Sequence, residues 1–85
     1  MMKLKELFNR DNVPFPEWLE DEPLKWDWEN STYLKGENIH KWELNTPIGF
    51  QSITLEDDTY TFTGYDLDNN LIFEQIVTPE YEMTS

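Results

Sequence analysis

The sequence predicts an α+β fold in which a short N-terminal helix, or one or two helical turns, packs on an antiparallel sheet of about five strands. Apolar residues recur at helical spacing near the start, and runs with the period of a strand fill most of the chain from residue 23 to 77. The stretches between these runs are too short for crossover helices, which excludes a parallel sheet. With 85 residues, we expect one small domain over 1–85, ending in a frayed tail at 79–85.

The helix is predicted over residues 2–10, because three apolar residues there fall on one helical face: Leu4, Leu7 and Phe8. Pro14 and Pro16 then favour extended backbone. Pro16 also suits the first position of a helix, so one further helical turn is expected before Pro23.

Five runs predict strands, namely 23–29, 39–45, 50–56, 59–65 and 71–77. The first alternates strictly and would place Leu24, Trp26 and Trp28 on one face. In the third, Phe50 is out of phase with Ile53, which predicts a bulge near Gln51. Residues 29–32, 35–38 and 66–70 have the composition of turns, and the last of these predicts a hairpin loop.

No pattern of residues predicts an enzyme, a cofactor or a metal site. The chain has no Cys and one histidine, His40, which is predicted to lie at a sheet face or edge. Asp66, Asp68 and Asn70 match the start of a calcium loop. However, Leu71 stands where that loop needs Gly, and Val77 stands where it needs a bidentate Glu. The three residues therefore predict a tight hairpin instead.

The charge distribution narrows the classes of partner. The net charge is −12, and all six Lys and Arg lie in the first 41 residues, so residues 42–85 hold nine carboxylates and no Lys or Arg. Such a surface repels nucleic acid and anionic membranes, and it attracts basic proteins. Because no secretory signal or membrane-spanning run is visible, we expect a cytoplasmic protein.

The candidate partner-binding residues are the carboxylates on the predicted sheet. Consecutive hairpins of a meander lie at opposite ends of the sheet, and Glu43 and Glu74 connect them if both face outward. The full set is Glu43, Glu56, Asp57, Asp58, Asp66, Asp68 and Glu74. A second acidic cluster is predicted at Glu20, Asp21, Glu22, Asp27 and Glu29.

In its size, acidity and lack of Cys, the chain resembles small acidic inhibitors, often encoded by phages and other mobile elements, that act as DNA mimics. The resemblance implies that carboxylates replace phosphates on the basic nucleic-acid-binding surface of a partner protein, namely a nucleic-acid-binding enzyme. One alternative is a small interaction or structural module whose acidity serves only solubility. Another is a carbohydrate-binding module that exposes Trp26, Trp28 and Trp42 with Tyr33, although the alternation of the first run favours Trp in the core.

Overall fold

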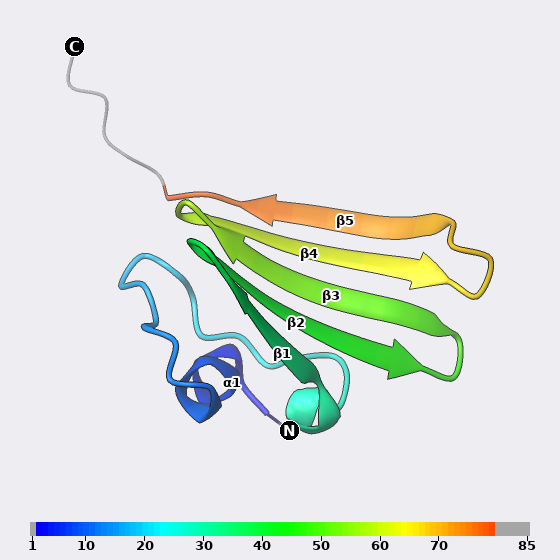
Figure 1. Ribbon diagram of the computed structural model, residues 1–85, viewed down its shortest axis with the longest axis horizontal. Coiled ribbons are helices and arrows are strands. Elements are labelled where there is room, and N and C mark those ends of the chain that lie inside the picture. Colours follow the sequence, from blue (N-terminus) through cyan, green and yellow to red (C-terminus); the bar gives the residue numbers. More distant parts are fainter. Residues whose placement is uncertain (1, 80–85) are drawn as a thin grey trace, which may run out of the picture.

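The computed structural model describes residues 2–79 and confirms the predicted α+β fold, with one short helix and a five-stranded antiparallel sheet. The sheet is a meander in which each strand pairs with the next along the chain (Figure 1). Its elements are α1 (Leu4–Arg10), the 3₁₀ turn η1 (Trp28–Asn30), β1 (Thr32–Gly36), β2 (Ile39–Thr46), β3 (Gly49–Glu56), β4 (Thr59–Asp66) and β5 (Leu71–Val77). The predicted tail lies outside the described residues, except for Pro79.

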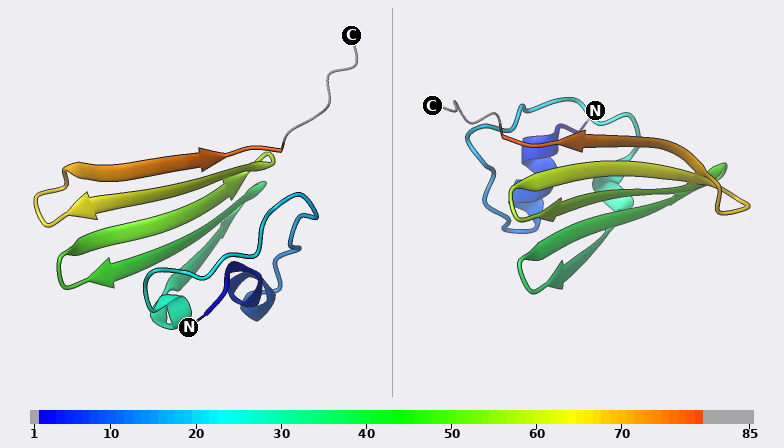
Figure 2. Two further views of the ribbon diagram at one scale, coloured as in Figure 1. Left: turned by 180° about the vertical axis from the view of Figure 1, so that it is seen from behind. Right: turned by 90° about the horizontal axis from the view of Figure 1, so that it is seen from above.

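Residues 2–31, called the N-terminal layer below, lie on one side of the sheet (Figure 2). The sheet face toward this layer, the covered face, includes the central row Trp42, Ile53 and Phe62. Trp42 and Ile53 are fully buried, together with Leu7 and Phe8 of α1. The opposite face carries the alternate residues of each strand and is called the open face.

The start of α1 is held by the chain that returns past it. The N–H of Leu4 donates to the carbonyl oxygen of Glu22 (2.9 Å), and the N–H of Lys5 donates to Asp21 Oδ1 (2.9 Å). These bonds satisfy amide groups that a helix start leaves without intrahelical partners. After Pro16 the chain makes a single hydrogen-bonded turn, closed by Leu19, and not the predicted helical turn.

The predicted strand at 23–29 is wrong. The chain there is irregular and ends in η1. β1 forms instead at Thr32–Gly36, where Thr32, Lys35 and Gly36 had been predicted as parts of turns. Asp27 explains part of the difference, because its carboxylate accepts hydrogen bonds from Glu29 N (3.2 Å) and Asn30 Nδ2 (3.0 Å). Such local bonds compete with strand pairing. The alternation nevertheless marked buried residues correctly, since Leu24 and Trp28 are 3% and 2% exposed.

The predicted bulge near Gln51 is also wrong. Gln51 pairs regularly with Leu44 and Gly64, and Phe50 lies on the open face beside Tyr65. The register shift lies instead between β4 and β5, at Gly64 and Tyr65. Phe50 needs no bulge because an aromatic ring can lie on the open face as well as on the covered face.

Candidate partner-binding surface

The open face gathers three of the predicted carboxylates. The register places Glu43 and Glu74 in one row across the sheet, separated by Ser52 and Thr63. The row spans three strand spacings, so the two residues are about 14 Å apart. Glu56 lies on the same face, four residues beyond Ser52 along β3, so it is about 14 Å from Ser52. The three carboxylates therefore form a widely spaced triangle.

Lys41 is the only Lys or Arg that the register places on the open face of the described strands. Its Nζ lies 3.0 Å from Glu43 Oε1 in a partly exposed ion pair. Pairs of this kind contribute only about 0–1 kcal/mol, because water screens them. The open face thus retains an excess of negative charge.

Further carboxylates lie at the end of the sheet next to Glu56. Asp57 and Asp58 form the two-residue turn between β3 and β4, with φ of 47° and 62°. A turn with two positive φ values matches the twist of a hairpin, and Asp tolerates this conformation better than most residues. Glu37 lies at the same end of the sheet. It is in the β1–β2 turn at residues 37–38, which leads into Ile39, and Ile39 pairs with Glu56. We call Glu37, Glu56, Asp57 and Asp58 the acidic end.

Sequence reasoning missed Glu37 as part of this surface. It lies in the predicted turn at 35–38, of which residues 37 and 38 form the β1–β2 turn. However, without β1 in the prediction, nothing indicated that this turn lies beside the one at Asp57 and Asp58.

Asp66 and Asp68 lie at the opposite end of the sheet, about 23 Å from Thr59 along β4. Asp66 Oδ1 accepts hydrogen bonds from the N–H of Asp68 (2.8 Å) and of Asn70 (2.9 Å), and Oδ2 accepts one from Asn70 Nδ2 (3.2 Å). The bonds from Asn70, its backbone N–H first, lower the pKa of Asp66. Asp66 shapes the hairpin loop, so the two aspartates do not join the acidic end in one patch.

The second predicted cluster is dispersed over the N-terminal layer. Asp21 holds the start of α1 and Asp27 holds η1. Glu20 and Glu22 line a groove beside β5, and the main-chain carbonyl of Glu29 accepts a bond from Arg10. Several carboxylates of this half therefore have structural roles.

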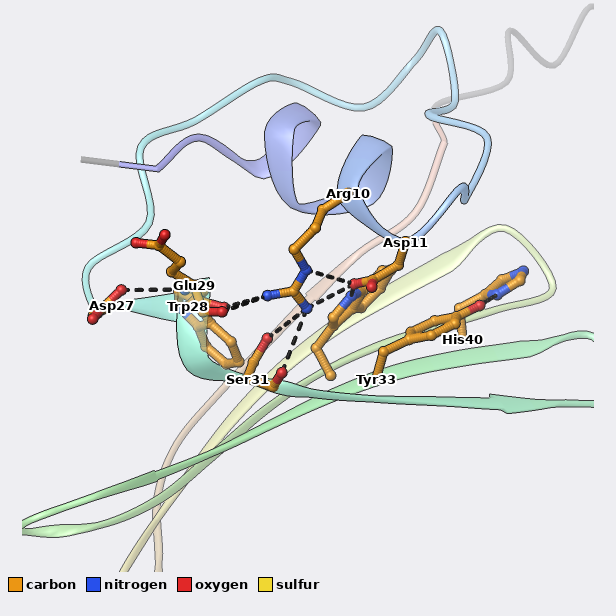
Figure 3. A network of polar contacts seen from close by, with 9 residues as sticks. Arg10, Asp11, Asp27, Trp28, Glu29, Ser31, Tyr33 and His40 are labelled. Atoms are coloured by element: carbon orange, nitrogen blue, oxygen red, sulfur yellow. Dashed lines mark hydrogen bonds and ion pairs between the residues drawn. The ribbon is translucent and has the colours of Figure 1, made fainter.

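Arg10 joins the end of α1 to the turn before β1 through a network of polar contacts (Figure 3). Sequence reasoning did not predict this network. Its guanidinium contacts Asp11 Oδ2 at 2.7 Å, and that oxygen also accepts a hydrogen bond from Trp42 Nε1 (2.7 Å). The same guanidinium donates to the main-chain oxygens of Trp28 (3.1 Å), Glu29 (2.8 Å) and Ser31 (3.5 Å), and to Ser31 Oγ (3.1 Å). A single cation thus holds together three parts of the chain.

Replacing Arg10 with Met should lower the free energy of unfolding by about 1–2 kcal/mol, because its charged hydrogen bond to the partly buried Trp28 carbonyl is lost together with several weaker, exposed ones. Replacement with Lys should cost less, since an ammonium keeps the charge but cannot reproduce the planar fork. Urea unfolding of the three proteins measures both changes. A loss below about 0.5 kcal/mol in the Met variant, the range of ordinary surface substitutions, would contradict this role.

The other aromatic and titratable residues lie where they support the fold. Of the predicted sugar platform, Trp28 and Trp42 are 2% and 0% exposed and offer no ring face to a sugar, whereas Trp26 and Tyr33 are partly exposed. His40 lies on the covered face of β2, as predicted, with Nδ1 2.7 Å from the hydroxyl of Tyr33. Burial, and secondarily the charge of Asp11, raises the pKa of Tyr33.

Residues 2–79 contain neither a metal-ligating cluster nor a membrane-spanning helix. No group of three or more His, Asp or Glu in this range lies so that it could hold a metal ion. No helix in it is long and apolar enough to cross a membrane.

The fold and the surface define a small antiparallel meander with one face covered by an N-terminal layer and the other rich in carboxylates. Comparison of the chain with protein-family models, with curated proteins and with solved structures gave no match. The function is therefore inferred from the charge and geometry of the open face and the acidic end.

Proposed function

We propose that this protein is a non-enzymatic, acidic binding protein that inhibits a basic partner by occupying its nucleic-acid-binding surface in place of phosphates. The observation that supports the proposal is the segregation of charge by face. Lys41 is the only cation that the described strands place on the open face, whereas the open face and the acidic end together carry Glu37, Glu43, Glu56, Asp57, Asp58 and Glu74.

Four of the other five cations, Lys3, Lys5, Arg10 and Lys25, belong to the N-terminal layer. Lys35 lies two residues before Glu37, on the covered face of β1. They are therefore poorly placed to neutralise the open face.

Glu43, Glu56 and Glu74 lie far enough apart on the open face that their mutual repulsion costs the fold little. Two charges 14 Å apart repel by only about 0.3 kcal/mol in water, and physiological salt reduces this further. A cationic groove placed against the surface would meet all of them at once, in a setting from which water is partly excluded. The same charges therefore contribute more to binding than they cost in stability.

The proposal predicts that neutralising the acidic end abolishes most binding. The test variant carries Glu56→Gln, Asp57→Asn and Asp58→Asn, since Asn also tolerates positive φ. Its matched control carries Glu17→Gln, Glu29→Gln and Asp68→Asn, which removes the same charge from positions away from the acidic end and from β5. Each immobilised protein is incubated with a cell extract at low salt, and the captured proteins are identified and then eluted with double-stranded DNA.

We expect the wild type and the control to capture the same basic proteins, and DNA to displace them. The test variant should bind about 10–100-fold more weakly, because three peripheral charges contribute roughly 0.5–1 kcal/mol each. If DNA displaces nothing, phosphate mimicry is wrong. If both variants bind as the wild type does, the acidity serves solubility alone.

A further inference from the structure

The two edges of the sheet differ in their protection. β1 is short, carries Lys35 in its second half, and begins next to Ser31, whose oxygens Arg10 binds. Short length and a Lys are the usual devices that prevent another strand from pairing at an edge. The edge at β1 is therefore protected against pairing with another strand.

The edge at β5 has neither device. It runs for seven residues without Lys, Arg or Pro, and no other strand of residues 2–79 pairs with its outer side. Four of its side chains are large, apolar and between 41% and 59% exposed: Leu71, Ile72, Phe73 and Ile76. An open edge of this kind offers main-chain N–H and C=O groups to an added strand.

A groove follows β5 on the covered side. Two adjoining hollows, of about 540 and 410 Å³, lie between β5 and residues 18–26 and share Glu22 and Gln75. Trp18 lines the first, and Trp26 and Phe73 line the second. The lining also includes Glu20, Glu22 and Lys25, so the groove is aromatic only in part. Side chains of an added strand that point to the covered side would enter it.

A second copy of this chain is a poor occupant for the edge. Glu74 is the central residue of β5, so the symmetric antiparallel register that pairs two β5 strands over their full length would set the two Glu74 side chains directly opposite each other. Like charges in that position are destabilising, and the net charge of −12 on each copy adds to the repulsion. A strand with Lys or Arg opposite Glu74 avoids both costs.

We infer that the free edge of β5 binds an extended segment of a basic partner protein as a sixth strand. The segment places Lys or Arg along the open face, one of them opposite Glu74, and apolar side chains on the covered side, in the groove at Trp26 and Phe73. This inference goes beyond the proposed function, because main-chain pairing at β5 requires none of the carboxylates of the acidic end.

The experiment uses two blocked peptides with the length of β5, in which Val alternates either with Lys and Arg or with Glu. Each is titrated into the full chain while the amide NMR signals are followed. The basic peptide should shift signals of β5 and quench or shift the fluorescence of Trp26 or Trp18 in the groove. Glu74→Lys should exchange the preference, so that the acidic peptide binds and the basic one does not.

A pair of matched variants separates edge pairing from general charge attraction. Ile76→Lys and Leu34→Lys both place Lys at an exposed open-face position, the first on the β5 edge and the second on the β1 edge. Ile76→Lys should weaken the basic peptide at least about tenfold, and Leu34→Lys should leave its affinity nearly unchanged.

Several results would overturn the inference. These are a basic peptide that leaves the β5 signals unmoved, equal losses in both Lys variants, or a dimer without peptide that Ile76→Lys dissociates. The variant neutralised at Glu56, Asp57 and Asp58 should still bind the peptide, so failure of the proposed function and failure of this inference give different results.

Discussion

Replacing Trp42 with Ala is expected to lower the free energy of unfolding by about 3–5 kcal/mol, the usual cost of truncating a buried aromatic side chain. Trp42 is fully buried, and its ring stacks on Phe8 with centroids 4.6 Å apart. Its Nε1 also donates to Asp11, so the substitution opens a cavity and removes a polar contact. Small domains have only about 5–15 kcal/mol of stability, so this loss is a large fraction of the total and should lower the melting temperature markedly.

Urea unfolding followed by circular dichroism measures this effect, and two variants calibrate it. Trp42→Phe keeps a ring against Phe8 but loses the bond to Asp11, so its cost should be smaller, about 1–3 kcal/mol. Ile48→Ala changes a side chain that is 61% exposed and should cost less than about 0.5 kcal/mol. Equal stabilities for Trp42→Ala and Ile48→Ala would show that Trp42 is not the centre of the core.

Replacing Gly49 with Ala should cost about 3 kcal/mol or more, because the clash is with backbone and cannot be relieved by a side-chain rotation. A Cβ atom at this position would lie 2.0 Å from the carbonyl oxygen of Tyr65, and the residue has a φ of 155°. Either β3 or β4 would have to move away from the other at the end of their ladder.

Gly36→Ala is the matched control for this second substitution. A Cβ at Gly36 meets nothing closer than 3.6 Å, an ordinary van der Waals distance, and its φ is not in the left-handed region. We expect a change within about 1 kcal/mol, of either sign. Thermal unfolding of the two variants side by side tests the contrast. Similar melting temperatures would contradict the close approach of β3 and β4 at Gly49.

The two proposed binding features meet at Glu74. This residue lies in the row with Glu43 on the open face and is also the central residue of the β5 edge. A basic partner could therefore add a strand at β5 and reach the open-face carboxylates with other parts of its surface. Linking two modest contacts in one partner raises the overall affinity without any new contact.

The sequence alone determined the helix and four of the five strands. The predicted runs at 39–45, 50–56, 59–65 and 71–77 agree with β2–β5 within a residue at each end. These elements were predictable because each contains its own information, in the alternation of apolar and polar residues and in the turn residues between the runs. The same local patterns predicted that Leu4, Leu7, Phe8, Trp28 and Trp42 would be buried.

Only the tertiary structure decided the place of the first strand and the sorting of the carboxylates. Alternation at 23–29 indicates which residues are buried but not whether a strand is available to pair, and Asp27 and Arg10 hold this segment in a turn instead. The register then sets Glu43, Glu56 and Glu74 on the face opposite the N-terminal layer and separates Asp66 from the acidic end. A local pattern marks which residues are buried, but the presence of a partner strand and the register of the pair depend on the packing of the whole fold.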